Sequence, residues 1–278
     1  MISGKARIAG VMGWPVSHSL SPALHNHWLT QLHIDGAYIP LSVAPEELEN
    51  AFRLLPKFGF VGWNLTVPHK EAALKLVDEV DSAAKAIGAV NTVVVKDGKL
   101  IGKNTDAGGF ISNLKQKIGD LTPYKKTALM LGAGGAARAV AYALKEEGFE
   151  TILIANRTHA RAQSLAKEFG APMRALPWEE IPGMLPQVTL LVNTTTLGME
   201  GQPPLALSLD NINPAALVTD IVYRPLETPL LIEARKRGCV TATGLGMLVF
   251  QAVNGFAAWF GKLPDIEDAE EYIVSQRA

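Results

Sequence analysis

The chain has 278 residues, a length that predicts two domains at about 150 residues per domain. Hydrophobic residues make up 48% and charged residues 19% of the chain, which excludes a disordered acidic or basic protein. Lys and Arg number 26 and Asp and Glu 27, so a net charge of -1 provides no global positive field for nucleic acid or an anionic membrane. The single cysteine, Cys239, excludes an internal disulfide and a cysteine-rich zinc site.

The N-terminal sequence is a poor match to an export signal. Gly13 and Pro15 interrupt its short apolar run, and no small-residue cleavage site follows. The longest uncharged stretch, residues 238–261, is long enough to span a bilayer but contains several glycines together with Gln251 and Asn254. We interpret it as a buried loop and helix, and we expect a cytoplasmic protein without a membrane or nucleic-acid partner.

The first hundred residues alternate short apolar runs with helical patterns, as βαβ units do. The predicted strands are 7–12, 37–43, 59–67, 93–95 and 100–101. A helix is predicted after Ser21, which can cap it, because Leu24, Trp28 and Leu32 recur on one face. Two more helices are predicted, one opened by Pro45 and one over residues 70–80.

A polar connection over residues 115–126 separates this region from a strand of different composition, and it marks a change of domain. The elements predicted after it are strand 127–131, helix 135–147, strand 151–155, helix 158–169, strand 188–193, strand 217–222, helix 228–237 and strand 239–242. This order predicts an open parallel sheet that is covered on both faces, and therefore an α/β fold.

The segment LGAGGAAR, residues 131–138, ends a predicted strand and opens a predicted helix. Gly132, Gly134 and Ala137 occupy the three small-residue positions of a dinucleotide fingerprint. Gly132 permits the tight turn, Gly134 lets the backbone approach a pyrophosphate, and Ala137 lets helix and strand pack closely. A bare packing turn is the alternative, but the strand-turn-helix context favours a dinucleotide held at the N–H groups of the helix start.

The end of the next predicted strand indicates which dinucleotide binds. An NAD site places a carboxylate there for the ribose hydroxyls, whereas this chain has Asn156, Arg157 and Thr158, with Arg161 one turn further on. Two guanidinium groups favour the 2′-phosphate of NADP. The alternative is that both arginines lie on a solvated helix face, but their position in the motif favours NADP.

Three strings in the first half, residues 13–26, 62–70 and 88–109, carry polar residues at strand ends and helix starts, where α/β sheets place their sites. These residues are Ser19, Ser21, Asn64, Thr66, Lys70, Asn91 and Asp106. Hydroxyl and amide groups can bind substrate hydroxyls, and a serine pair near a helix N-terminus can hold a carboxylate. The set suits a small polyhydroxylated acid as substrate.

Several motifs occur together in a fixed order along the chain. They are GWPVSHSLSPALHN at 13–26, GWNLTVPHK at 62–70, NTD at 104–106, GAGGAAR at 132–138, NRTHARA at 156–162, DIVYRPLETPLL at 220–231 and GLGMLVFQA at 244–252. This combination resembles the NADP-dependent shikimate dehydrogenase family of aromatic amino-acid (chorismate) biosynthesis. The resemblance implies an oxidoreductase that reduces 3-dehydroshikimate to shikimate with NADPH. It also implies a substrate domain at 1–104, completed by helices at 243–278, and a Rossmann-type domain at 105–242.

The resemblance carries residue roles as well. Ser19 and Ser21 are similar to the carboxylate binders, and the implied residues around the ring hydroxyls are Thr66, Lys70, Asn91, Asp106 and Gln251. Tyr223 and Gly244 are similar to positions that line the cleft. The implied cofactor residues are Gly132, Ala133, Gly134, Gly135, Ala136, Asn156, Arg157, Thr158, Arg161, Thr194 and Gly244. The departures from the pattern are slight, namely Trp14, Trp63, Leu65 and the repeated threonines 194–196.

Lys70 and Asp106 are the candidates for proton transfer. Hydride removal from a secondary alcohol leaves a carbonyl only when a base accepts the hydroxyl proton, and the reverse reaction needs an acid. Burial would lower the pKa of a lysine and a neighbouring carboxylate would raise it, so the sequence leaves the role of each residue open. A solvated lysine and a helix cap are the alternative, which the surrounding motifs disfavour.

Other functions are weighed against this one. Five of the six histidines fall in the first quarter of the chain, but without a metal-binding spacing, so we expect no metal. The alternatives are a quinate/shikimate dehydrogenase of relaxed specificity and a non-catalytic NADP-binding sensor on the same scaffold. The expected partner is a small-molecule substrate, and the sequence leaves monomer and homodimer open.

Overall fold

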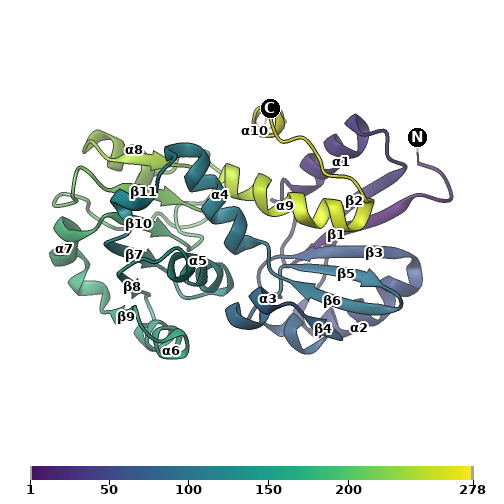
Figure 1. Cartoon of the computed structure of the whole chain (residues 1–278), viewed down its shortest axis with the longest axis horizontal. Helices are drawn as coiled ribbons and strands as arrows, with labels where there is room; N and C mark the ends of the chain where they lie inside the picture. The colour runs from purple at the N-terminus through teal and green to yellow at the C-terminus, as the bar shows by residue number, and fades with distance from the viewer. Residues whose placement is uncertain (1, 277–278) are drawn as a thin grey trace. The chain divides into compact units, whose positions relative to one another are not determined.

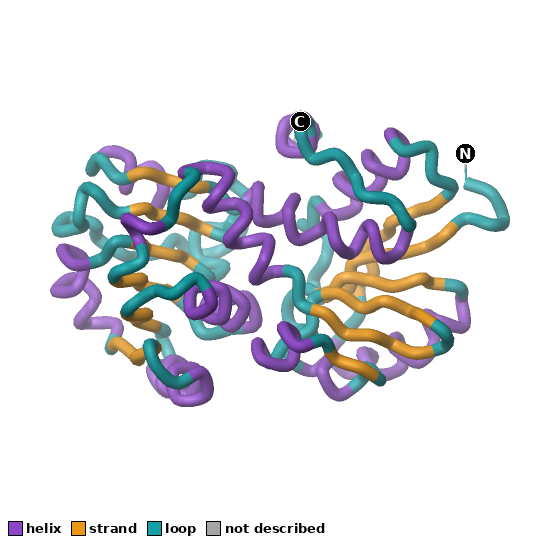
Figure 2. Tube along the Cα trace, in the orientation of Figure 1, coloured by secondary structure: helices purple, strands orange, loops and turns teal. Residues whose placement is uncertain are grey.

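The chain forms two six-stranded sheets, each in its own unit. The computed structural model describes residues 2–276 (Figures 1 and 2). One unit comprises residues 1–109 and 248–278, and the other comprises residues 110–247. The division falls inside helices α4 (Asp106–Ile118) and α9 (Leu245–Phe260), five residues after each boundary expected from the sequence. These two helices therefore contribute to both units.

The first unit contains a mixed sheet of order β2-β1-β3-β5-β6-β4. Its strands are β1 (Arg7–Gly13), β2 (Gly36–Ser42), β3 (Phe60–Leu65), β4 (Glu79–Val80), β5 (Thr92–Lys96) and β6 (Lys99–Lys103). Strand β1 pairs in parallel with β2 and β3, whereas β5 runs antiparallel to β3 and β6. The helices that belong wholly to this unit are α1 (Ser21–Gln31), α2 (Leu48–Leu54), α3 (Ser82–Ile87) and α10 (Ala269–Ser275).

Apolar side chains fill both sides of this sheet. On one side Trp63 is fully buried and packs in a cluster with Met12, Val93 and the α2 residue Phe52. Another cluster joins aromatic side chains of α1, β2 and α9, including Trp28, Tyr38, Phe256 and Trp259, around the buried ring of His25. The carboxyl ends of β1 and β3 are thereby held in fixed positions for the segments that follow them.

The second unit contains a parallel sheet of order β12-β11-β10-β7-β8-β9. Its strands are β7 (Thr127–Leu131), β8 (Thr151–Ala155), β9 (Met173–Leu176), β10 (Leu190–Asn193), β11 (Leu217–Asp220) and β12 (Val240–Ala242). Its helices are α5 (Gly135–Glu146), α6 (His159–Phe169), α7 (Ile181–Met184) and α8 (Pro229–Lys236). The chain moves outward from β7 to β9 and then from β10 to β12 on the other side, so the order reverses between β7 and β10. Ligands of such sheets bind at this point.

The predicted α/β fold class is confirmed, with differences in single elements. The helix predicted over residues 70–80 is wrong, because this segment contains only a short 3-10 turn, Ala72–Lys75, followed by β4. The backbone carbonyl of Lys70 accepts a hydrogen bond from Val90 N at 2.8 Å, so it is already engaged outside a helix. Ser21 does not cap α1 but is its first residue, after Leu20. The short strand β9 was not predicted.

No helix within residues 2–276 has both the length and the apolar composition needed to cross a bilayer.

Candidate functional site

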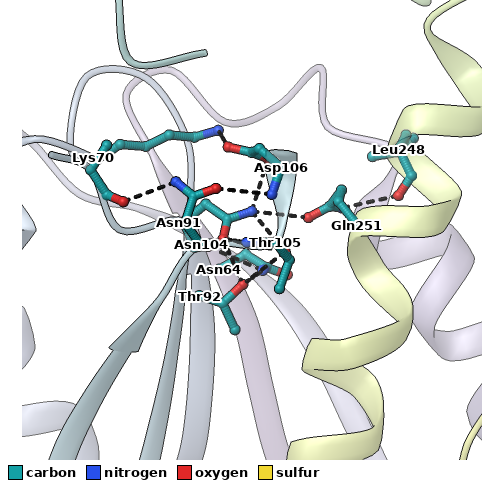
Figure 3. A network of polar contacts seen from close by, with 10 residues as sticks. Asn64, Lys70, Asn91, Thr92, Asn104, Thr105, Asp106, Leu248 and Gln251 are labelled. Carbon is teal, nitrogen blue, oxygen red and sulfur yellow. Dashed lines mark hydrogen bonds and ion pairs between the residues drawn. The ribbon is translucent and has the colours of Figure 1, made fainter. Parts of the chain in front are cut away.

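Lys70 and Asp106 form a close ion pair in the first unit (Figure 3). The Lys70 Nζ donates to Asp106 Oδ2 at 2.6 Å, and the side chains are 15% and 7% exposed. Lys70 follows β3 by five residues, while Asp106 opens α4, where its carboxylate lies at the positive end of the helix dipole. Both charges are thus compensated in a site that largely excludes water.

Asn91 connects this ion pair to the rest of the site. Its Nδ2 donates to Asp106 Oδ1 at 2.8 Å, with Thr105 Oγ1 at 3.0 Å and Gln251 Oε1 at 3.3 Å as further acceptors. Its Oδ1 accepts the backbone N–H of Thr105 at 2.8 Å, which fixes the orientation of the amide. The carboxylate of Asp106 is therefore held on one oxygen by Asn91 and on the other by Lys70.

A second layer of polar side chains lies behind Asn91 (Figure 3). Asn64 accepts the Tyr38 hydroxyl at 2.6 Å and donates to Thr92 Oγ1 at 2.9 Å. Thr92 in turn donates to Asn91 Oδ1 at 2.9 Å. Asn64 is buried and its amide is occupied by protein partners, so it supports Asn91 from below the site. Satisfied networks of this kind hold polar groups rigidly.

The start of α4 and the course of α9 bring Gln251 to this network. Asn104 precedes the helix, and its Oδ1 accepts the backbone N–H of Asp106 at 3.0 Å. Gly109 allows α9 to approach, because a Cβ atom at that position would lie 2.8 Å from the backbone N of Gln251. Gln251 Nε2 donates to Leu248 O at 3.0 Å, leaving its Oε1 toward Asn91.

The other predicted substrate residues lie at the carboxyl edge of β1 and β3. Ser21 N lies 3.3 Å from Ser19 Oγ, so the structure brings the two serines together at the start of α1. Thr66 directly follows β3, is half-buried, and donates its backbone N–H to Met12 O at 2.9 Å. Among residues 2–276 no hydrogen bond joins Ser19 or Thr66 to the ion pair of Lys70.

The glycine turn of the second unit has the geometry that a dinucleotide site needs. Gly132 follows β7 with φ at 113°, which favours glycine, and Gly134 is the N-cap of α5. A Cβ atom at Gly134 would meet no heavy atom within 4 Å, so the helix start is open to an approaching group. The first N–H groups of α5 have no side-chain cap and can bind a phosphate. Ala133, Gly135 and Ala136 are all half-buried beside them.

The segment after β8 carries the predicted phosphate-binding residues. Asn156 Nδ2 donates to Thr158 O at 2.9 Å, and Thr158 is the N-cap of α6. Arg157 and Arg161 are exposed, and neither has an ion-pair partner among the residues that the structure describes. Two unpaired guanidinium groups at a helix start, with its own positive dipole, suit a phosphate dianion.

Two further predicted residues, Tyr223 and Gly244, follow β11 and β12. Tyr223 is half-buried. A Cβ atom at Gly244 would clash with the carbonyl oxygens of Asp220 and Ile221, which explains the glycine by close backbone approach. Asp220 is itself buried, and burial raises its pKa to about 6 against the hydrogen bonds from Val222, Thr228 and Asn193.

The structure adds site residues that the sequence reasoning missed. Tyr38, Thr92 and Thr105 complete the network around Asn91 in the first unit, while Asn193 and Asp220 form a buried pair in the second. Thr92 and Thr105 directly follow Asn91 and Asn104 in the sequence, so a search of the residues next to the motif positions would have found them. Tyr38 carries no such signal.

Two histidines of the first unit, His25 and His69, are buried, whereas His33 is exposed. His25 stacks on Tyr38 with ring centroids 3.9 Å apart, and burial lowers its pKa to about 3. His69 Nε2 bonds to Val43 O at 2.8 Å, and burial lowers its pKa as well. Within residues 2–276 no three His, Cys, Asp or Glu side chains are grouped as a metal site would require.

Comparisons with known proteins agree with this geometry. A shikimate dehydrogenase substrate-binding domain model matches residues 11–93, a shikimate/quinate 5-dehydrogenase model residues 113–198, and a shikimate 5′-dehydrogenase C-terminal domain model residues 244–271. The shikimate dehydrogenase (NADP(+)) of Rhodospirillum rubrum is 54% identical over 97% of each chain.

Solved structures show the same likeness. Shikimate 5-dehydrogenase from Thermus thermophilus, in complex with NADP(H) and shikimate, is similar with a TM-score of 0.87 and 42% identity, over 97% of this chain and 99% of that one. Quinate dehydrogenase from Corynebacterium glutamicum, in complex with NAD, has a TM-score of 0.90 and 31% identity, over 97% and 99%.

Proposed function

Because this chain belongs to the shikimate dehydrogenase family, we propose that it catalyses the reversible reduction of 3-dehydroshikimate to shikimate with NADPH. The observation that carries the proposal is the ion pair of Lys70 and Asp106, 2.6 Å apart and held by Asn91. Oxidation of a polyhydroxylated acid requires a group that accepts the proton of the hydroxyl that becomes the carbonyl, and this pair can serve as that group. The non-catalytic sensor has no need of it.

The pair handles the proton of the reacting hydroxyl. When bound, NADPH supplies the hydride. The Lys70 ammonium can donate a proton to the oxygen that becomes a hydroxyl, and Asp106 keeps that ammonium next to the site. In the oxidative direction the pair, once it has lost that proton, accepts the hydroxyl proton at Lys70 Nζ. Because the two side chains are in direct contact, we propose that they act in proton transfer as a pair.

The remaining polar residues of the first unit bind and orient the substrate in this proposal. Ser19 and Ser21, at the start of α1, take the carboxylate, where the helix N-terminus favours negative charge. The side chains assigned to the ring hydroxyls are Thr66, Asn91 and Gln251, with Asn64 supporting Asn91. Thr66 has a hydroxyl at the carboxyl edge of the sheet that is free to exchange hydrogen bonds.

The second unit fits NADP. The open N–H groups at the start of α5 suit the pyrophosphate, and the Gly132, Ala133, Gly134, Gly135 and Ala136 backbone permits its approach. We assign the 2′-phosphate to Asn156, Arg157, Thr158 and Arg161, and we place Thr194 and Gly244 near the rest of the cofactor. Each charge-assisted hydrogen bond contributes about 1.5 to 3 kcal/mol, enough to distinguish NADP from NAD.

Quinate with NAD is the competing substrate and cofactor pair. The quinate dehydrogenase of Corynebacterium glutamicum, which binds NAD, shares this fold. Arg157 and Arg161 favour the phosphate of NADP over the bare ribose hydroxyls of NAD. We further propose that the protein is cytoplasmic, that it acts as a monomer or homodimer, and that it has no nucleic-acid partner, consistent with the balanced charge.

The test is an absorbance assay of the reduced nicotinamide with the purified protein. Four reactions are compared: shikimate or quinate as substrate, each with NADP or NAD as cofactor. We expect rapid reduction of NADP with shikimate as substrate. For each of the other three combinations we expect a kcat/KM that is lower than for shikimate with NADP by about tenfold or more. Equal rates with quinate would favour the enzyme of relaxed specificity. Absence of turnover in all four reactions would contradict the proposed function.

A further inference from the structure

The side chain of Asn193 holds together the turn that follows β10. Its Oδ1 accepts the backbone N–H of Thr195 at 3.0 Å and the Thr195 hydroxyl at 2.7 Å. Its Nδ2 donates to Leu197 O at 3.1 Å and to Asp220 Oδ1 at 3.0 Å. Asn193 is fully buried, so these contacts are made in the absence of competing water. One amide thus fixes both arms of the turn at residues 194–198.

Asp220, at the end of the neighbouring strand β11, anchors this amide. Its carboxylate is 1% exposed and accepts three neutral donors: Asn193 Nδ2, Val222 N at 3.0 Å and Thr228 Oγ1 at 2.8 Å. Thr228 is the N-cap of α8, so the positive end of that helix also favours the charge. Among the residues that the structure describes, no Lys or Arg pairs with this carboxylate. A buried charge without a cation is costly, so its retention calls for a reason beyond stability.

The turn held by these two residues lies against the glycine turn. Thr194 donates its backbone N–H and its hydroxyl to Leu131 O, at 2.8 and 2.6 Å. A Cβ atom at Gly132 would lie 2.6 Å from Thr194 Oγ1. Strands β10 and β7 are neighbours, with Asn193 opposite Leu131. The turn at 194–198 therefore flanks the point where the strand order reverses and a dinucleotide binds.

We propose that Asn193 and Asp220 are positioning residues for the cofactor, which hold the turn at 194–198 in the place that dinucleotide binding requires. The inference rests on the proposed function. It concerns the part of the site that NADP and NAD share, whereas Arg157 and Arg161 concern the phosphate that only NADP carries. The two sets of residues therefore predict different patterns of loss.

The test replaces the amide of Asn193 with a carboxylate. Asn193→Asp keeps the acceptor for Thr195, removes the donor to Leu197 O, and places two carboxylates about 3 Å apart in a buried site. The matched control is Asn213→Asp. Asn213 also donates to a carbonyl, Val188 O at 3.3 Å, and accepts a backbone N–H, that of Ala215 at 3.0 Å, but it precedes β11.

We expect Asn193→Asp to raise the KM for NADP and for NAD alike, by about 10- to 100-fold, with the KM for shikimate changed by less than about twofold. Asn213→Asp should leave all three values within about twofold. The exchanged pair Asn193→Asp with Asp220→Asn should recover at least about threefold of the lost cofactor affinity, because the amide introduced by Asp220→Asn can donate to the carboxylate introduced by Asn193→Asp. Thermal unfolding of each variant shows whether it is folded.

Unchanged KM values for both cofactors in folded Asn193→Asp would overturn the inference, as would a loss confined to NADP or an equal loss in Asn213→Asp. If Asn193→Asp fails to fold, Asp220→Asn decides, since it keeps the shape and removes the charge. It should then raise both cofactor KM values by about 3- to 10-fold, and unchanged values would overturn the inference. Failure of the proposed function differs, because the wild-type protein would then lack turnover with shikimate.

Discussion

The candidate site of the first unit is made of side chains, whereas that of the second unit is made mainly of backbone groups. In the first unit the proposed chemistry belongs to side chains, namely the ion pair of Lys70 and Asp106 and the amides that hold it. In the second unit it belongs to the backbone, because the open N–H groups at the start of α5 and the left-handed Gly132 leave space for a ligand. In the proposed reaction, proton transfer therefore depends on individual side chains of the first unit. Cofactor binding depends on the backbone conformation of a turn in the second unit.

This difference predicts how substitutions act. Removal of Lys70 or Asp106 from the first unit should change turnover, because a group that we propose to move the proton is lost. Removal of a side chain from the second unit should change cofactor affinity, because the chemistry of the hydride comes from the cofactor. Substitutions that reverse this pattern would show that the two sites are not separable in function.

The largest effect is expected for Lys70→Ala. We expect kcat to fall by about 100- to 10,000-fold, the usual range for a lost general acid or base, with a smaller effect on shikimate binding. Lys75→Ala, at an exposed lysine of the same segment, is the control and should retain full turnover. The measurement is steady-state kinetics at saturating shikimate and NADP. A kcat for Lys70→Ala within about twofold of wild type would show that Lys70 is not the proton donor and that another group has this role.

Arg157→Ala should discriminate between the cofactors. We expect the KM for NADP to rise by about 10- to 100-fold while the KM for NAD changes little, because only NADP carries the 2′-phosphate. Arg174→Ala, an exposed arginine on β9, is the matched control. Both cofactors are measured with the same preparation of each variant. An equal rise in the KM for NADP and for NAD would show that Arg157 does not bind the 2′-phosphate.

His25 predicts a pH dependence of stability in the first unit. Burial lowers its pKa to about 3 from 6.5, so between these values the unfolded chain binds a proton that the folded chain does not. Its contribution to stability is therefore lost as pH falls below 6.5, by about 1.4 kcal/mol per pH unit. His25→Phe keeps a ring against Tyr38 and removes two buried ring nitrogens that have no hydrogen-bond partner within residues 2–276.

Denaturant unfolding of wild type and His25→Phe between pH 7 and pH 5 measures this contribution. The variant should gain stability relative to wild type as the pH falls. Asp220 in the second unit has the opposite effect on the pH dependence of stability, since its raised pKa makes the folded state bind the extra proton between pH values of about 3.8 and 6. This effect is the same in wild type and in His25→Phe, so it cancels when the stability of one is subtracted from that of the other. If the free energy of unfolding changed with pH in the same way for wild type and His25→Phe, His25 would not be a buried neutral group.

The smallest effects are expected for the serines of α1. Ser19→Ala and Ser21→Ala should each weaken the binding of shikimate by about 0.5 to 1.5 kcal/mol, the contribution of one hydrogen bond, while the KM for NADP stays constant. The effect is larger if the carboxylate of the substrate is left unpaired. Ser17→Ala, an exposed serine of the same loop, is the control. Unchanged shikimate KM in both variants would remove the two serines from the site.

The glycine turn of the second unit could be located from the sequence more directly than the polar network of the first unit. The glycines at 132 and 134 are local signals, because turn, helix start and strand end all lie within a few residues. The network around Asn91 joins residues from β2, β3, β5, α4 and α9, and no pattern in the sequence pairs Tyr38 with Asn64 or Asn91 with Gln251. Only the resemblance to a family pointed to Asn91 and Gln251 together.

Elements were missed for similar reasons. Strand β9 has only four residues, Met173–Leu176, too few to show an alternation of apolar and polar residues. The helix predicted over 70–80 is wrong because tertiary contacts decide there, as the hydrogen bond between Val90 N and Lys70 O shows. That same contact places Lys70 beside Asn91, so the departure from the local pattern lies at the candidate catalytic residue.

The most direct test of the proton-transfer pair is a double-mutant cycle on Lys70 and Asp106, read as kcat with saturating shikimate and NADP. Asp106→Asn keeps the shape and removes the charge. If the two residues act as one unit, the double variant should lose much less than the product of the two single losses, and its kcat should lie within about tenfold of Lys70→Ala. Losses that multiply would show that Lys70 and Asp106 act independently and would contradict the assignment of the pair.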